Sequence, residues 1–385
     1  MEQRFSHKSL KQIYCIIVSI ILSVIIAIII YQLFFNVNYS KKIEIKNIST
    51  DKSYINDKSN IGSDLVQIND KLFYNYNNDC FKYGLYVIGQ NNTNRIWWDG
   101  FSFEPQCEIS LTTIYKNHIL NPIADSNSKY LDTNNENSFE IEGSYLNGEI
   151  VIREFDVDKG EYEEFLKIPN PDKVKFSSSF QVCDGYFYLF SIDNEIYRYN
   201  ENYDKPLNII SKNDFDLSAF DMKTYSYFFG DDIYFLTLNN NRPSVCRYDI
   251  NAQKQLSIVS LDGVIETENG IDNFIISGDG EGYFCVNNNQ LYQINFVTKQ
   301  IEKVYETDGA LKVNLFNSKP VIAVEKSSEK NGIYVVYDLE NIDRLTNTEA
   351  CSIYNFDDIY IYYTDSFDKL YRVSVSNKKL ENIFD

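Results

Sequence analysis

Histidine is nearly absent from this sequence: its 385 residues include two, His7 and His118. So few histidines exclude a metal centre built from several of them and leave little for histidine-based acid–base catalysis. Basic residues are also under-represented, with 36 Lys and Arg against 55 Asp and Glu and a formal net charge of −19. A nucleic-acid-binding protein needs clustered Lys and Arg to contact phosphates, so we expect no nucleic-acid partner.

The motifs of common catalytic classes are missing as well. The sequence contains no GxSxG nucleophile turn, HExxH zinc motif, Walker phosphate loop or CxxC pair. Nucleophilic, zinc-dependent, phosphate-loop and thiol-redox chemistry therefore have no support. We predict no catalytic residue, no metal site and no cofactor.

Aromatic residues, in contrast, are abundant. The chain has 31 Tyr and 26 Phe, aromatics make up 15% of it, and hydrophobic residues make up 44%. This is too much apolar material for a disordered chain.

One apolar run, Ile13 to Phe35, extends for 23 residues without a charge. At about 1.5 Å per residue it would form a helix of roughly 34 Å, long enough to cross a hydrocarbon core of about 30 Å. It is longer than the apolar part of a signal peptide, and no small-residue cleavage pattern follows it. We therefore predict an uncleaved transmembrane helix whose partner is the lipid bilayer.

This helix divides the chain into a short basic tail (1–12), the membrane span (13–35), a polar stalk (36–64) and a large domain (65–385). A short head before a single span favours a cell-membrane protein with an extracytoplasmic C-terminal domain, although basic residues flank the span almost equally. Residues 1–42 carry a net charge of +4 and the remainder carries −23. An anionic bilayer should therefore repel the domain, which favours a position away from the membrane on its stalk.

The large domain consists of repeats, each with an alternating strand, a polar turn and a second alternating strand. A tight turn and an aromatic-rich strand precede each of these hairpins. Equivalent hairpin residues are 49, 46, 42 and 37 positions apart, and four short strands in about 40–50 residues is the period of a propeller blade. The residues that mark the last five copies are Tyr197, Cys246, Tyr292, Tyr334 and Tyr371.

We therefore predict an all-β fold, a β-propeller of seven four-stranded blades, preceded by the N-terminal transmembrane helix. Hairpins that begin at Tyr83 and Ile150 complete the seven. The second blade carries an insertion near residues 116–148, which could instead conceal an eighth blade. Asn-rich turns, such as that at Asn239, suit the fold because asparagine tolerates positive φ.

The last repeat contains the run Tyr362-Tyr363-Thr364-Asp365, with Arg372 in the strand that follows. It resembles the YWTD repeat of low-density-lipoprotein-receptor-like propellers. Other blades keep the LYR-like part of this pattern, as Arg198, Arg247 and Gln293. The chain is similar to bacterial membrane-anchored propellers related to that group, and the resemblance implies an extracytoplasmic interaction module.

Both tryptophans, Trp97 and Trp98, lie in an aromatic stretch near the edge of the first blade. Such side chains could stack on a glycan ring or anchor a protein partner, although packing between sheets would also explain them. We take Trp97, Trp98 and His118, the only histidine of the domain, as candidate partner-binding residues. A hydrogen-bonding role within the fold is the alternative for His118.

Closely spaced acids also attract attention, but we interpret them as turn residues. The stretch Asp156–Gly160 superficially resembles a calcium loop, yet its glycine is misplaced and it lies between two strands. The stretch Ser277–Gly282 also falls in a turn within a blade. The pairs Asp231-Asp232 and Asp357-Asp358 recur at one blade position, where we expect solvated turn acids.

The cysteines of the domain are scattered over different blade positions, which favours small buried apolar residues over a disulfide framework. Cys80 and Cys107 are the only pair that we consider as a possible disulfide.

The function predicted from these patterns is that of a membrane-anchored propeller that binds a protein or a cell-envelope glycan. Propellers present loops on a rigid frame, so they can bind without any catalytic signature. The alternative is a propeller glycosidase or lyase that uses acidic residues at the central channel.

Overall fold

The structure is a computed structural model of the chain. It describes residues 7–34, 38–39, 65–68, 71–76, 84–88, 93–97, 113–115, 118–121, 148–156, 161–183, 185–265, 270–277, 280–338, 341–355 and 358–383.

Seven antiparallel sheets make up the domain, and each is formed by four strands that are consecutive in the sequence. We number these sheets as blades 1 to 7. Blades 1–3 contain β2 (Leu65–Ile68), β3 (Lys71–Tyr76), β4 (Gly84–Ile88), β5 (Thr93–Trp97); β6 (Thr113–Tyr115), β7 (His118–Asn121), β8 (Glu149–Asp156), β9 (Glu161–Pro169); β10 (Phe176–Cys183), β11 (Tyr186–Ser191), β12 (Ile196–Tyr199) and β13 (Leu207–Ile210). Blades 4–7 contain β14 (Ser226–Phe229), β15 (Asp232–Asn239), β16 (Arg242–Asp249), β17 (Lys254–Ser260); β18 (Ile271–Ser277), β19 (Glu281–Val286), β20 (Gln290–Asn295), β21 (Gln300–Glu306); β22 (Ala310–Phe316), β23 (Lys319–Glu325), β24 (Gly332–Val336), β25 (Ile342–Thr346); β26 (Ser352–Asn355), β27 (Tyr360–Thr364), β28 (Leu370–Ser374) and β29 (Leu380–Asn382).

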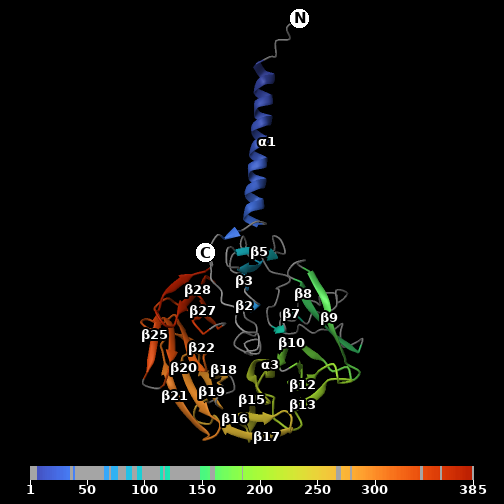
Figure 1. Ribbon diagram of the computed structural model, residues 1–385, viewed down its shortest axis with the longest axis vertical. Coiled ribbons are helices and arrows are strands. Elements are labelled where there is room, and N and C mark those ends of the chain that lie inside the picture. The colour runs from blue at the N-terminus through green and yellow to red at the C-terminus, as the bar shows by residue number, and fades with distance from the viewer. Residues whose placement is uncertain are drawn as a thin grey trace.

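The blades follow one another around a ring, so that blade 7 returns to the side of blade 1 (Figure 1). The first strand of a blade is the innermost: β10 contacts β6, β14 contacts β18, and β22 contacts both β18 and β26. This arrangement confirms the predicted seven-bladed β-propeller, with no eighth sheet among the described residues. The large insertion of blade 2 falls between β7 and β8, and residues 122–147 lie outside the described part of the chain.

Burial along each blade explains why aromatic and β-branched residues dominate the sequence. The second strands β11, β15, β19 and β23 are buried at nearly every position, because both of their faces pack against neighbouring blades. The fourth strands lie at the outer edge and are less buried; β21, for example, contains no buried residue. Pleated surfaces of this kind favour Val, Ile, Tyr and Phe.

The ring is held together by side chains packed between blades. Tyr188 of blade 3 and Phe228 of blade 4 have ring centroids 4.1 Å apart, and one apolar cluster joins these two blades. The ring closes in the same way: a cluster contains Leu72 and Tyr86 of blade 1 and Tyr362 of blade 7. No strand is exchanged between the first and last blades in the described sheets, so side-chain packing closes the ring.

Tight turns between strands have the predicted asparagine chemistry. Asn240 and Asn241 have φ of 53° and 60°, and Asn287 and Asn288 have φ of 52° and 57°. Asparagine adopts this left-handed conformation at lower cost than most residues.

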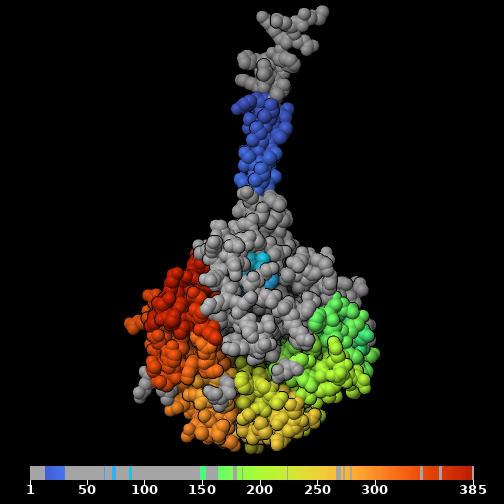
Figure 2. Space-filling model, in the orientation of Figure 1, coloured from blue at the N-terminus to red at the C-terminus, as the bar shows by residue number. Residues whose placement is uncertain are grey.

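An N-terminal helix, α1 (His7–Phe34), extends away from the sheets (Figures 1 and 2). Within the part of the chain that is described, no helix satisfies the combined length and apolarity needed to cross a membrane. Shortly after α1, the two-residue strand β1 (Asn38–Tyr39) pairs antiparallel with β5 and gives blade 1 a fifth strand.

The described cysteines of the domain form no disulfide, as predicted. Cys183, Cys246 and Cys285 are buried and serve as small apolar residues. Cys351 is partly exposed and donates a hydrogen bond from Sγ to Oε2 of Glu325 at 2.7 Å. Burial, together with this carboxylate, raises the pKa of the Cys351 thiol to about 12. Cys80 and Cys107 lie outside the described residues.

Candidate functional site

A polar cleft of about 590 Å³ lies between two loops on one face of the ring. One loop is the turn between β11 and β12. The other leads from β13 to the short helix α3 (Met222–Tyr225), where blade 4 begins. The residues that line the cleft are Asp193, Asn194, Lys212, Asn213, Asp214, Phe215, Asp216, Leu217 and Ser218.

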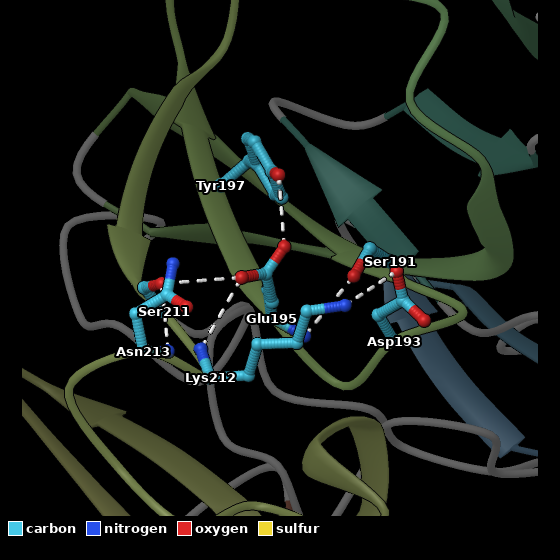
Figure 3. Close-up of polar contacts among 7 residues, drawn as sticks. All are labelled: Ser191, Asp193, Glu195, Tyr197, Ser211, Lys212 and Asn213. Atoms are coloured by element: carbon cyan, nitrogen blue, oxygen red, sulfur yellow. Dashed lines mark hydrogen bonds and ion pairs between the residues drawn. The ribbon is translucent and has the colours of Figure 1, made fainter.

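Next to this cleft, the two loops are joined by the buried carboxylate of Glu195 (Figure 3). Its Oε1 accepts hydrogen bonds at 3.2 Å from Oγ of Ser211 and from the backbone N–H of Lys212. Its Oε2 accepts one at 3.1 Å from the Tyr197 hydroxyl. A buried carboxylate is costly unless its oxygens are satisfied, and here both oxygens accept hydrogen bonds. Glu195 therefore fixes the second loop onto the end of β12.

Tyr197 is neutral at physiological pH because of this arrangement. Burial, and then the negative charge of Glu195, raises the pKa of Tyr197 to about 12. The hydroxyl consequently remains a hydrogen-bond donor to the carboxylate over the whole physiological range.

Strand β15 of blade 4 supports the loop that follows β13. The Phe215 ring packs edge-on against Phe235, with centroids 5.0 Å apart. The carbonyl oxygen of Asp216 accepts hydrogen bonds from the backbone N–H of Leu238 and from the Thr237 hydroxyl, both at 3.0 Å. The cleft is thus formed by two blades and supported by strands of both.

The polar side chains at the surface of the cleft retain free hydrogen-bonding capacity. Lys212 pairs with Asp193, with Nζ and Oδ2 3.1 Å apart (Figure 3). In the described part of the chain, the Asp214 carboxylate and the Asn213 side-chain amide make no hydrogen bond to protein. Three Asp and one Lys among the lining residues give the cleft a net charge of −2. Such a surface can both donate and accept hydrogen bonds and favours a ligand with polar or cationic groups.

The residues that we selected from the sequence lie elsewhere in the fold. Trp97 ends β5, where its Cα pairs with that of Leu85, and His118 begins β7 opposite Tyr115. Trp98 falls outside the described residues. Trp97 and His118 therefore belong to blades 1 and 2, whereas the cleft belongs to blades 3 and 4.

The expectation that paired turn acids are merely solvated is wrong for Asp232. Its side chain is 13% exposed, and Oδ2 lies 2.5 Å from Nη2 of Arg247. Asp231 accepts a hydrogen bond from the side chain of Asn251 at 2.9 Å. Asp232 precedes Tyr234 by two residues, and Tyr234 pairs directly with Arg247 on the neighbouring strand. The sequence alone does not reveal this register between β15 and β16.

The strands that flank the two calcium-like stretches pair as hairpins, as the turn hypothesis expects, and residues 157–160 and 278–279 lie outside the described part of the chain. β8 ends at Asp156 and its hairpin partner β9 begins at Glu161. Ser277 ends β18, which pairs with β19 beginning at Glu281. No group of three or more potential metal-ligating side chains occurs among the described residues.

Two acidic side chains are buried in the described part of the chain, Glu195 and Asp365. Asp365, from the YWTD-like run, accepts hydrogen bonds from the backbone N–H groups of Phe367 (2.8 Å) and Lys369 (3.0 Å) and from the Tyr371 hydroxyl (3.2 Å). Asp365 therefore stabilises the turn between β27 and β28, whereas Glu195 joins the start of β12 to the loop that follows β13.

No protein-family model matches this chain, and no curated protein matches its sequence. Among solved structures, it is similar to an oligogalacturonate lyase in complex with manganese, with 9% identity, 63% of this chain and 75% of that chain covered and a TM-score of 0.40. A mitotic checkpoint complex matches with 10% identity over 61% of this chain and 71% of that chain, at a TM-score of 0.40. A nidogen/laminin complex matches with 15% identity over 62% and 90%, at a TM-score of 0.36. The class of protein is defined by the seven sheets themselves, which form a β-propeller.

Proposed function

We propose that this chain is a membrane-anchored β-propeller that binds a protein or cell-envelope glycan outside the cytoplasm through the cleft between blades 3 and 4. The observation that supports it most directly is the unengaged hydrogen-bonding capacity of Asn213 and Asp214 on a rigid support. Loops held on a rigid frame are where binding sites usually lie. The proposal assigns no catalytic step, because Glu195 and Asp365 are each used to hold a turn.

The anchoring part of the proposal is supported by the side chains of α1. From Tyr14 to Ile30 every described side chain is exposed, including Ile16 at 59% and Leu22 at 58%. Apolar side chains exposed on all sides of a helix need a non-aqueous environment or a partner. The uncharged run in the sequence has the length that a bilayer requires.

Anchoring and orientation can be tested on intact cells that express the full chain with a C-terminal tag. We expect the protein to remain in the membrane pellet after alkaline extraction and the tag to be cleaved by externally added protease. Release into the alkaline supernatant would contradict anchoring, and protection of the tag until the cells are lysed would contradict the orientation.

Binding through the cleft can be tested by in-cell cross-linking followed by purification in detergent, together with sedimentation on insoluble envelope glycan. The informative variant is Asp214→Lys, which reverses a charge in the cleft. The matched control is Glu302→Lys, which reverses an exposed charge on the outer strand β21. We expect Asp214→Lys, but not Glu302→Lys, to lose a cross-linked protein or to lose glycan sedimentation. Equal behaviour of both variants and the wild type in both assays would contradict the proposal.

A further inference from the structure

An arginine recurs in the third strand of several blades. In blade 3 this arginine lies near the end of β12 that is remote from the cleft. Arg198, Arg247 and Arg372 occupy the third position of the LYR-like pattern. Each guanidinium lies over a tyrosine ring of the second strand, at 4.6 Å from the centroid for Arg198, 5.7 Å for Arg247 and 4.2 Å for Arg372. Tyr186 and Tyr360 precede by two residues the residue that pairs with the arginine, whereas Tyr234 pairs directly with Arg247. Arg198 and Arg372 therefore share one stacking arrangement, and Arg247 has a related one.

In blades 4 and 7, the Nε and Nη2 atoms of this arginine both contact a carboxylate. Nε and Nη2 of Arg247 lie 2.7 and 2.5 Å from Oδ2 of Asp232. Nε and Nη2 of Arg372 lie 2.8 and 2.6 Å from Oε2 of Glu381. The two blades supply this carboxylate from different strands, β15 and β29. The pairing is thus a property of the arginine position, and either neighbouring strand can satisfy it.

Blade 3 has no carboxylate at either of the two positions that are equivalent to Asp232 and Glu381. Tyr186 stands where blade 4 has Asp232, two residues before the tyrosine that faces the arginine. Leu207 lies directly opposite Arg198, as Glu381 lies opposite Arg372. Arg198 therefore has an aromatic residue and an apolar residue at the two positions that supply the acid in blades 4 and 7.

The remaining contacts of Arg198 bring no carboxylate into direct contact with it, although its partner Asn251 donates in turn to Oδ1 of Asp231 at 2.9 Å. Arg198 is 9% exposed. Its Nη1 donates to Oδ1 of Asn251 at 3.2 Å, and its Nε is buried without a hydrogen-bond partner. No acidic side chain pairs with it in the part of the chain that the structure describes. A buried guanidinium with an unsatisfied donor is unfavourable, and an anion at that edge would remove the cost.

We propose that the Nε and Nη2 edge of Arg198 is a binding site for the carboxylate of a ligand. The Nε atom is fully buried, and Leu207, which is 39% exposed, occupies the position that Glu381 has in blade 7. The carboxylate therefore reaches the guanidinium when the Leu207 side chain turns outward into solvent. A carboxylate is the matching chemistry because each of the two equivalent arginines holds one carboxylate oxygen between Nε and Nη2. The net charge of −19 disfavours non-specific accumulation of anions, so occupancy depends on this local pairing.

The site does not depend on the proposed function. The cleft lies at the turn between β11 and β12, whereas Arg198 is one residue before the end of β12, next to the turn that leads to β13. Binding at one can therefore fail while binding at the other is found.

The test is thermal unfolding of the full-length protein in detergent, in sodium acetate and in sodium chloride of equal ionic strength. A ligand that binds only the folded state raises the unfolding temperature. We expect acetate to raise it by about 2 °C over chloride when acetate is tenfold above its dissociation constant. Arg198→Met should abolish this difference. The matched control Arg247→Met should retain it, because the edge of Arg247 already holds Asp232.

A second variant keeps the test decisive if Arg198→Met fails to fold. Leu207→Glu places a carboxylate where blade 7 has Glu381 and should raise the unfolding temperature in chloride while removing the response to acetate. Leu207→Met, which supplies no oxygen acceptor, should leave the response to acetate unchanged. If the wild type responds equally to the two salts, or if Leu207→Glu still responds to acetate, the proposal is wrong.

Two further measurements identify the source of the carboxylate. Asp184 lies outside the described residues near Tyr186, and Asp184→Asn should leave the response to acetate unchanged; a response that appears or increases in this variant would show that the chain supplies its own carboxylate and would overturn the proposal. Comparing acetate with a capped Glu-containing peptide then separates a small acid from an acidic protein segment. A shift at lower concentration with the peptide supports the protein source, and one with acetate supports the small acid.

Discussion

Glu195→Ala should destabilise the propeller by about 2–3 kcal/mol. The substitution removes three hydrogen bonds to a buried, charged acceptor, each worth about 1.5–3 kcal/mol in a fully buried setting. The sum must be reduced because Ser211 and Lys212 are partly or fully exposed and water can replace the carboxylate. The Tyr197 hydroxyl and the Lys212 N–H remain as donors without their protein acceptor, which accounts for most of the estimated loss.

Glu195→Gln refines this prediction because it preserves the size of the side chain. Its carbonyl oxygen can still accept from Ser211 and Lys212, and the Tyr197 hydroxyl can rotate to accept from the new amide. What disappears is the charge, and a hydrogen bond to a charged group exceeds a neutral one by about 1 kcal/mol. We therefore expect a loss of about 1 kcal/mol, clearly smaller than for alanine.

The assay is denaturant unfolding of the full-length protein in detergent, followed by intrinsic fluorescence and fitted with a common slope. Glu302→Ala is the control, since it removes an exposed acid and should change the free energy of unfolding by less than about 0.5 kcal/mol. The reasoning is refuted if Glu195→Ala behaves like Glu302→Ala, or if glutamine costs as much as alanine. Partner binding in the cross-linking assay should also fall in Glu195→Ala, because Lys212 and Asn213 are positioned by the loop that Glu195 holds.

Three other predictions concern ring closure, thiol reactivity and acid stability. Tyr74→Phe should cost about 1–2 kcal/mol in chemical unfolding, because the Tyr74 hydroxyl of blade 1 donates to the carbonyl oxygen of Asp368 in blade 7. Cys351 should resist alkylation at pH 8, and Glu325→Gln should accelerate it in peptide mapping by mass spectrometry, since the carboxylate helps to raise the thiol pKa to about 12. Hydrogen bonds from the serines of the β23–β24 loop hold the pKa of Asp308 well below its ordinary value. Its stabilising contribution is therefore complete above about pH 4 and disappears as the pH falls further, so Asp308→Asn should flatten the loss of thermal stability between pH 5 and pH 2.

A specific measurement would contradict each of these three predictions. An unchanged unfolding midpoint in Tyr74→Phe would show that apolar packing alone closes the ring. Alkylation of Cys351 at the rate of a small-molecule thiol in solution would contradict the role of Glu325. An acid limb as steep in Asp308→Asn as in the wild type would mean that other carboxylates control acid unfolding.

Much of the architecture could be predicted because it is encoded locally. The hairpin at Ile196 and its equivalents were recognisable from alternation over a few residues, and the Asn-rich turns from the tolerance of asparagine for positive φ. Repetition strengthened each assignment, since the same pattern returns at the period of a blade. The choice of Trp97, Trp98 and His118 as partner-binding residues remains a prediction.

The cleft could not be found in this way. Asp193 and Asp214 belong to different loops, and nothing in their spacing indicates that they line one surface. Glu195 follows Asp193 by two residues in an ordinary polar turn, and its burial depends on Ser211 and Lys212 arriving from the next loop.

The sequence by itself determined that aromatic and β-branched residues alternate in short hairpins, that these repeat seven times, and that an uncharged apolar segment precedes them. These properties follow from side-chain size, polarity and local backbone preference. The tertiary structure decided which charges meet: Asp232 with Arg247, Glu195 with the loop from blade 3 to blade 4, and Arg198 with no carboxylate among the described residues. Such pairings depend on strand register and on the stacking of blades, and both arise from contacts between residues distant in the chain.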